Sequence, residues 1–347
     1  MLTQKQIIEI KEHLEKAQNP VFFFDNDEDG LCSFILLRKY SNKGKGVPIK
    51  SFPELSFDYF KKAQELNADY IFILDKPLVS IDFLNESHKY NLPVVWIDHH
   101  PINSEIPKFV NYYNPLLNKE KTNEPVTALC YQISQRKEDL WISITGCISE
   151  KFIPNNYAEF KKQYPELITE SEDPWELYHN SEIGKVARML SFGLKDRISN
   201  VVQMLKYLIR SKSPYDVLDE NSKNKQLHKR FNEIEKKYKK LIQEAKEKSK
   251  KYKKLLLFEY SGETAISSDL SNRLMYLFPE RVIFIIRIKD NEVKISGRGP
   301  KVREIYLEII KDFEHARGGG HEMAIGGQFQ KDDLEKFKEK IIGMVEK

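Results

Sequence analysis

Short apolar runs alternate with amphipathic stretches through the first hundred residues. The apolar runs occupy 21–24, 47–52, 70–74 and 94–97, and stretches with helical periodicity occupy 31–40, 57–67 and 80–90. This alternation predicts a parallel β-sheet whose strands are joined by crossover helices. Because the runs are continuously apolar rather than alternating with polar residues, we expect strands that are buried on both faces.

The middle of the chain is predicted to be helical. Residues 127–210 have helical periodicity and are broken by Pro154, Pro165 and Pro174. From 221 to 254 the apolar residues fall on one helical face, and lysines cover most of the rest. We interpret this second stretch as one long connecting helix.

The last hundred residues predict a smaller mixed domain. Strand-like runs occupy 255–260, 281–288 and 292–297, helical stretches occupy 268–278, 301–314 and 331–346, and a glycine-rich loop is expected at 318–320. The sequence therefore predicts an α/β chain in three parts. These are a parallel-sheet domain over 1–215, a connecting helix over 216–254 and a smaller α/β domain over 255–347.

Composition excludes some classes of protein. A chain of 347 residues with 40% hydrophobic positions can build two cores. We expect no membrane partner, because the start lacks a signal-peptide pattern and no apolar run is long enough to span a bilayer. Three cysteines without a Cys-x-x-Cys pair favour a reducing cytoplasm. The net charge of +4 is too small to argue for a nucleic-acid partner.

Acidic residues follow three of the predicted strands. Asp25, Asp75 and Asp98 each come directly after an apolar run. The first of these turns, "DNDEDG", adds Asp27 and Asp29. Since the carboxyl ends of parallel strands converge on one crevice, we expect these side chains to meet there. So many like charges repel one another unless cations neutralise them.

The third turn, "DHHP", adds His99 and His100 to the carboxylates. Oxygen and imidazole ligands together suit manganese, magnesium or zinc, so a two-metal site is the physical interpretation. Each motif alone is ambiguous, because aspartates also cap helices and occupy turns. Three acidic strand ends on one sheet edge favour the metal site over a purely structural role.

Several motifs, taken in order, resemble those of the DHH superfamily of phosphoesterases. They are "DNDEDGLCSFILL", the isolated Asp75, "VVWIDHHP", "ITGCISEKFIP" and "GGGHEMAIGG". The Asp-x-Asp-x-Asp-Gly form and the long helix are most similar to RecJ-like nucleases, including the archaeal ones. The resemblance implies a DHH catalytic domain joined by a long helix to a DHH-associated substrate-binding domain.

The resemblance also implies roles for individual residues around two divalent cations, manganese or magnesium. The implied metal ligands are Asp25, Asp27, Asp29, Asp75, His99 and Glu150. Asp98 would orient its neighbours, and His100 would face the substrate phosphate. Two positions depart from the family pattern. Phe23 stands where other members have a histidine, so that Asp25 takes its place, and Glu150 stands where the family has aspartate.

The C-terminal motifs imply a grip on substrate phosphate. The implied substrate-binding residues are Ser296, Arg298, Gly318, Gly319, Gly320 and His321. Without the resemblance, a lone glycine triplet indicates a flexible turn or a helix C-cap more often than an anion site. The lysines of the connecting helix could likewise track a nucleic-acid backbone or simply form a solvated face, because glutamates are interleaved with them.

The leading functional hypothesis is a RecJ-like exonuclease that releases mononucleotides from single-stranded DNA or RNA. Replication or repair proteins are further candidate partners. One alternative is a nanoRNase or nucleotide phosphatase acting on short substrates. Another is a weakly active binding protein associated with the replicative helicase, an alternative that Glu150 and the unusual "LDKP" around Asp75 keep open.

Overall fold

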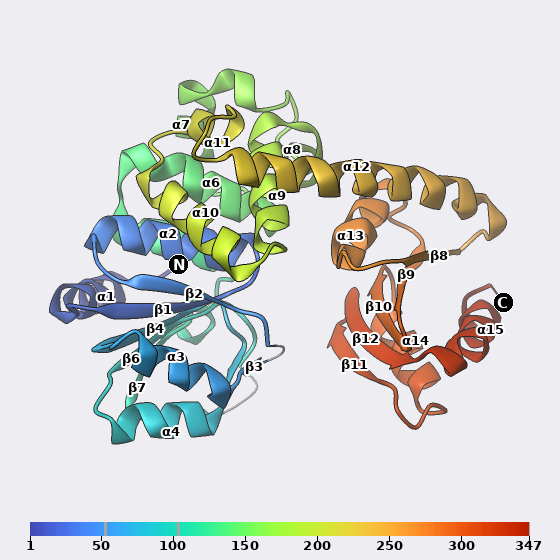
Figure 1. The fold of residues 1–347 in the computed structure, drawn as a ribbon, viewed down its shortest axis with the longest axis horizontal. Helices are drawn as coiled ribbons and strands as arrows, with labels where there is room; N and C mark the ends of the chain where they lie inside the picture. The colour runs from blue at the N-terminus through green and yellow to red at the C-terminus, as the bar shows by residue number, and fades with distance from the viewer. Residues whose placement is uncertain (52–53, 103–104, 347) are drawn as a thin grey trace. The chain divides into compact units, whose positions relative to one another are not determined.

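The computed structural model describes residues 1–51, 54–102 and 105–346 and divides into two compact units, Met1–Arg230 and Phe231–Lys347 (Figure 1). The division falls within helix α12 (Lys225–Lys248), the long helix that its single apolar face predicts. Among the described residues, no helix is long and apolar enough to cross a membrane.

The first unit is built on a five-stranded sheet with the order β2-β1-β4-β6-β7. All of its strand pairs are parallel, as predicted. The strands are β1 (Pro20–Asp25), β2 (Lys45–Ile49), β4 (Tyr70–Leu74), β6 (Val94–Ile97) and β7 (Val110–Tyr113). A separate two-residue pair joins β3 (Glu54–Leu55) to β5 (Leu78–Val79). The sequence does not predict β3, β5 or β7, because β3 and β5 have only two residues each and Asn111 interrupts the apolar pattern of β7.

Helices cover both faces of this sheet, and alternate residues of β1 show how. Phe23 packs edge-on against Phe83 of α4 (Ile81–Lys89), with 5.5 Å between ring centroids. Phe24 faces the other way and stacks on Phe34 of α2 (Glu28–Ser41), at 5.1 Å. Both strand residues are fully buried. Burial on two faces explains why the strands read as continuous apolar runs.

The helical region predicted over 127–210 is confirmed. The remaining helices of the first unit are α1 (Gln4–Lys16), α3 (Phe60–Glu65), α5 (Val126–Ser134), α6 (Leu140–Ser149), α7 (Tyr157–Gln163), α8 (Pro174–Asn180), α9 (Glu182–Leu194), α10 (Ile198–Arg210) and α11 (Pro214–Leu218). Pro154 precedes α7, and Pro174 opens α8 at its first position. Proline is tolerated there because its missing N–H has no partner within the helix.

The second unit has its own five-stranded sheet, with the order β11-β12-β10-β9-β8. Its elements are β8 (Leu255–Ser261), β9 (Val282–Lys289), β10 (Glu292–Arg298), β11 (Arg317–His321), β12 (Ala324–Gln330), α13 (Ser267–Leu277), α14 (Val302–Ile310) and α15 (Leu334–Val345). Only the β8–β9 pair is parallel. The sheet and α14 and α15 enclose a core that includes Phe284, Tyr306 and Phe337.

The prediction of a glycine loop at 318–320 is wrong, because these residues form the edge strand β11. Gly318 pairs with Gly327, and Gly319 pairs with Gly326. A Cβ on Gly318 would lie 2.4 Å from the Gly326 carbonyl oxygen, so glycine is what permits this close approach. Glycine has a low strand propensity, and the pairing partner that decides the conformation is not local.

The turn from β1 into α2 holds several of the acidic residues in place through a cap hydrogen bond and close backbone contacts. Asp27 is the N-cap of α2, and its side chain accepts a hydrogen bond from the Gly30 amide at 3.0 Å. A Cβ on Gly30 would lie 2.5 Å from the Asp25 carbonyl oxygen and 2.7 Å from the Asp25 nitrogen. Both of these are backbone atoms, which have little room to move.

Replacing Gly30 should therefore destabilise the protein. We expect Gly30→Ala to lower the free energy of unfolding by about 1–3 kcal/mol, the usual cost of overpacking. Gly343→Ala is the matched control, because a Cβ there meets no atom within 4 Å and alanine favours the helix by up to about 1 kcal/mol. Urea denaturation measures both variants. Equal stability of the two would contradict this account of the turn.

Candidate metal centre

Three carboxylates lie at the same edge of the first sheet. Strands β1, β4 and β6 are adjacent in the sheet, and Asp25, Asp75 and Asp98 stand at or just after their carboxyl ends. A backbone hydrogen bond joins the ends of β4 and β6, since the Asp75 amide donates to the Ile97 carbonyl at 3.0 Å. The sheet topology therefore brings together residues that are far apart in the sequence.

The first turn of α2 contributes Asp29, which is fully buried. One of its carboxylate oxygens accepts a hydrogen bond from the Thr127 amide at 2.7 Å, and the other accepts from the Val126 amide at 2.9 Å. These amides belong to the first residues of α5. The N-terminus of α5 thus fixes Asp29 in place, a contact between distant segments that the sequence does not reveal.

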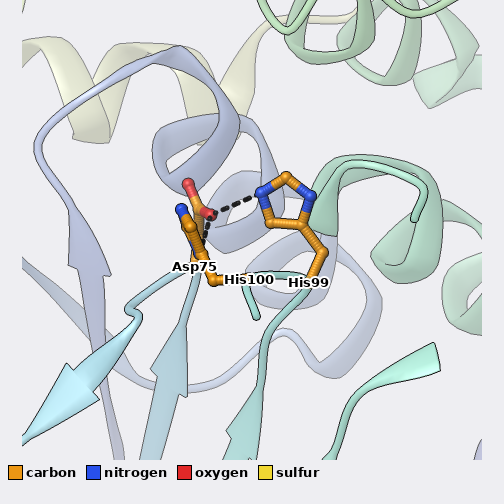
Figure 2. A group of neighbouring side chains, drawn as sticks. All are labelled: Asp75, His99 and His100. Carbon is orange, nitrogen blue, oxygen red and sulfur yellow. Dashed lines mark ion pairs between the residues drawn. The ribbon is translucent and has the colours of Figure 1, made fainter. Parts of the chain in front are cut away.

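Asp75, His99 and His100 form the tightest group of metal-binding side chains among the described residues. Each offers one ligand atom, and these atoms lie within 4.8 Å of one another. Figure 2 shows both imidazole rings directed toward the Asp75 carboxylate. His99 Nε2 lies 3.5 Å and His100 Nδ1 lies 3.8 Å from Asp75 Oδ1.

Two atoms of this group are buried without a hydrogen-bond partner among the described residues. They are Asp75 Oδ1 and His99 Nδ1. Asp75 also has a left-handed backbone, with φ of 58°. Buried polar atoms are normally satisfied, so orphaned polar atoms beside a strained residue point to a ligand. Carboxylate oxygen and imidazole nitrogen are a donor set that fits a divalent cation.

Asp98 orients His100. Asp98 is fully buried, and its Oδ1 lies 2.8 Å from His100 Nδ1. The Tyr112 hydroxyl donates to Asp98 Oδ2 at 3.3 Å, and Asn114 Nδ2 donates to the His100 carbonyl at 2.9 Å. The Asp98 carboxylate accepts a hydrogen bond from His100 Nδ1, which leaves His100 Nε2 for a metal or a substrate.

The carboxylates influence one another electrostatically. Burial, followed by the charges of Asp29, Asp27, Asp25 and Glu150, raises the pKa of Asp75 well above its usual value. Burial and the charges of Asp25, Glu150 and Asp29 do the same to the pKa of Asp27. Glu150, the C-cap residue of α6, is exposed, and its charge acts on both of these carboxylates. Such mutual repulsion is what a bound cation relieves.

The negative charges of the cluster also act on His100. Burial lowers its pKa, but the hydrogen bond and charge of Asp98, together with Glu150 and Asp25, raise it overall. The histidine therefore lies within the field of the whole cluster rather than of Asp98 alone.

Lys76 is the residue that sequence reasoning missed. Its side chain is fully buried, and its ammonium donates to Asp25 Oδ1 and to the Ser51 carbonyl, both at 2.9 Å. Trp96 Nε1 donates to the Lys76 carbonyl at 2.9 Å. A buried lysine thus supplies one positive charge to the acidic cluster. The signal in the sequence was a lysine directly after a strand-end aspartate, in a stretch that is otherwise apolar.

In the second unit, Arg298 is a half-buried guanidinium that forms no ion pair among the described residues. Its Nε donates to Asn272 Oδ1 at 2.7 Å, and its Nη1 donates to Ser296 Oγ at 3.2 Å. Burial lowers the pKa of Arg298 to about 10, against an opposing effect of Asp269. An anion bound at the remaining Nη2 edge would compensate this desolvation.

The glycines of β11 present bare backbone at the edge of the second sheet. A Cβ on Gly319 would meet no atom within 4 Å, so the space above it is open. An edge strand leaves backbone N–H groups unpaired on one side, which suits an anion. Ser296 lies on β10, next to β12 rather than β11. The side chain of His321 lies outside the described residues.

Asp75 provides a direct test of the metal centre. We expect Asp75→Asn to stabilise the metal-free protein, because it removes one like charge from the cluster. The same variant should lose the stabilisation by Mn²⁺, which for the wild type is about 2.7 kcal/mol at 100 times the dissociation constant. Thermal unfolding with and without Mn²⁺ measures both effects, and Asp82→Asn on the exposed face of α4 is the control. An unchanged Mn²⁺ response in Asp75→Asn would exclude Asp75 as a ligand.

Lys76 can be tested through its partner. Lys76→Met should lower the free energy of unfolding by about 3 kcal/mol, because it leaves Asp25 without its cation. Adding Asp25→Asn should restore part of that loss, since the uncompensated charge is then gone. A double-mutant cycle from urea denaturation gives the coupling energy. Additive effects of the two substitutions would show that the ion pair contributes nothing.

Comparisons with known proteins bear on the fold of the chain. Residues 250–347 match the DHHA1 domain family. RecJ from Thermus thermophilus, solved in complex with Mn²⁺, superposes with a TM-score of 0.72 at 14% identity, covering 98% of this chain and 54% of that one. A second structure, exonuclease RecJ bound to manganese, gives 0.67 at 13% identity and covers 97% and 92%.

CDC45 from Entamoeba histolytica has the same fold more distantly, with a TM-score of 0.55 at 9% identity and coverage of 97% and 98%. No curated protein matches the chain in sequence. The chain spans 54% of the length of the Thermus RecJ, and these structural similarities show the fold alone. Residues 250–347 match the DHHA1 domain family, and the chain as a whole shares the two-domain fold of the RecJ structures.

Proposed function

We propose that the chain is a metal-dependent phosphodiesterase that releases mononucleotides from the end of single-stranded DNA or RNA. One observation carries the proposal. Asp75 Oδ1, buried without a hydrogen-bond partner among the described residues, faces two imidazoles within a cluster of like charges. A phosphoesterase that uses two metal ions needs such a set of ligands, and a purely structural cluster does not.

Residues of the first unit would bind the metal ions and position the phosphate. We assign the metal ligands to Asp25, Asp27, Asp29, Asp75, His99 and Glu150, for two divalent cations, manganese or magnesium. When bound, these cations supply the Lewis acidity that activates water and neutralises the charge on the phosphate. His100, whose ring Asp98 holds through Nδ1, presents Nε2 to a phosphate oxygen and positions it.

The second unit would hold the substrate. Arg298 keeps its Nη2 edge for a phosphate, with Ser296 fixing the guanidinium through Nη1. Within Gly318, Gly319 and Gly320, the backbone amides that point away from β12 add further donors, and His321 follows them in the strand. None of these groups is a nucleophile, so their role is binding and orientation of the strand.

A binding protein with a weakened site is the second candidate function. The ion pair between Lys76 and Asp25 favours it, because the lysine competes with a metal for that carboxylate. Glu150 favours it as well, since the longer side chain shifts a ligand that magnesium holds in a strict geometry. The fold that the chain shares with CDC45 is compatible with this role.

Nucleotide release from end-labelled strands separates these candidates. Single-stranded DNA and RNA of 2 to 40 nucleotides are incubated with Mn²⁺ or Mg²⁺, and the products are resolved by length. We expect mononucleotides from the long strands. Asp75→Asn should reduce the rate at least about a hundred-fold, because a two-metal site supplies several kcal/mol of transition-state stabilisation. Asp82→Asn should leave the rate unchanged.

Other outcomes contradict the proposal in different ways. Cleavage restricted to strands of a few nucleotides would identify an enzyme for short substrates, of the nanoRNase or nucleotide phosphatase kind. Tight binding of a strand without cleavage by any metal would favour the binding protein. Cleavage that survives in Asp75→Asn would point to a contaminating nuclease.

A further inference from the structure

A cleft on the helical side of the first unit carries a surplus of positive charge. Its volume is about 680 Å³, and helix α10, helix α11 and the segment before α12 line it. The lining residues are Gln203, Lys206, Tyr207, Arg210, Ser211, Lys212, Asp216, Asn221, Ser222 and Lys223. None of them belongs to the candidate metal centre, and the function proposed above makes no use of them.

The cations in this cleft have no acidic partners. Lys206, Arg210, Lys212 and Lys223 are all exposed, and none of them forms an ion pair among the described residues. On α12, by contrast, Lys239 pairs with Glu235 at 3.3 Å. Unpaired cations that converge on one hollow create a positive potential that attracts an anionic ligand.

The acidic groups nearby do not cancel this charge. Asp216 is the one acid in the described lining, and its carboxylate is already engaged by the backbone amides of Lys212 at 2.6 Å and Ser213 at 3.2 Å. Asp219 and Glu220 follow α11 but lie outside the lining. Four cations and one hydrogen-bonded carboxylate leave the cleft positive.

Hydrogen bonds hold the walls of the cleft in place. The Tyr207 hydroxyl on α10 donates to the Asp216 carbonyl on α11 and accepts from Asn221 Nδ2 at 3.0 Å. Asn224 Nδ2 donates to the carbonyls of Asp216 at 3.0 Å and Asp219 at 2.9 Å. Two helices and the start of a third are thereby tied together, so that the cleft exists before any ligand binds.

Helix α2 connects this cleft to the metal centre. Lys39, near the end of α2, donates its ammonium proton to the carbonyl of Ser211 in the cleft lining, at 2.6 Å. Asp29 lies ten residues earlier on the same helix, which corresponds to about 15 Å along its axis. One strand of duplex DNA advances about 3.4 Å per phosphate, so a single strand as compact as that covers this distance with roughly five nucleotides.

We propose that this cleft binds the phosphodiester backbone of the single strand a few nucleotides away from the metal centre. The inference rests on the proposed function for the identity of the ligand. The four unpaired cations bind phosphates without reading bases, so the site holds strands regardless of sequence. Strands too short to span about five nucleotides reach only one of the two sites.

The test compares the salt dependence of strand binding. Fluorescence anisotropy measures the affinity of a 20-nucleotide strand and a 4-nucleotide strand between 50 and 200 mM salt, without metal and in the Asp75→Asn background. Lys206→Gln/Arg210→Gln removes two cleft cations. Lys5→Gln/Lys61→Gln removes two exposed lysines from α1 and α3 and is the matched control.

We expect the cleft variant to bind the 20-nucleotide strand more weakly and with a smaller salt slope. Each lost contact lowers the slope by about 0.7, so over this fourfold rise in salt the parent should lose about seven-fold more affinity than the variant. The 4-nucleotide strand should also bind the variant more weakly, because without metal the acidic cluster repels phosphate and leaves the cleft as the favoured one of the two sites. The control should match its parent.

Three outcomes overturn the inference. They are equal salt slopes in the cleft variant and its parent, an unchanged affinity of the variant for the 4-nucleotide strand, and, when labelled polyglutamate is measured in the same way, a loss confined to that peptide, which would assign the cleft to an acidic protein segment. The inference about the cleft and the proposed function can be refuted independently of each other. Strand binding that depends on the cleft, without cleavage, refutes only the function, whereas cleavage with unaltered binding in the variant refutes only the cleft.

Discussion

Repulsion among buried carboxylates is the constraint on which the rest of the first unit depends. Strands β1, β4 and β6 place Asp25, Asp75 and Asp98 at one sheet edge, and the turn into α2 adds more acids beside them. Burial and like charge raise the pKa of Asp75 well above its usual value. The fold tolerates the electrostatic cost of this repulsion because backbone amides, a buried lysine and the adjacent histidines contact the carboxylates.

The balance of charge in this cluster also defines what the protein can do. Lys76 neutralises Asp25 from within the protein, whereas Asp75 Oδ1 has no hydrogen-bond partner among the described residues. The site is thus partly neutralised by its own chain and partly open to cations. Glu150 reaches the same cluster from the end of α6 with one more methylene than aspartate. If the proposed function holds, Lys76 and Glu150 decide between a tuned catalytic centre and a weakened one.

The sequence predicts the acidic strand ends because parallel strands have a simple pattern and a fixed direction. Asp25, Asp75 and Asp98 follow from that rule alone, whereas Glu150 needs the resemblance to the DHH superfamily. Lys76 escapes prediction because a lysine after a strand normally lies exposed. The glycine strand β11 is not predicted either, because its conformation depends on backbone pairing with β12, which leaves no local pattern in the sequence. Contacts between distant segments are what sequence reasoning lacks.

Anomalous diffraction from crystals grown with Mn²⁺ locates manganese in the protein without reference to activity. We expect two manganese peaks about 3.5–4 Å apart, bounded by Asp27, Asp29, Asp75, His99 and Glu150. No manganese at this cluster, with Asp75 Oδ1 bound instead by a protein or solvent donor, would contradict this expectation.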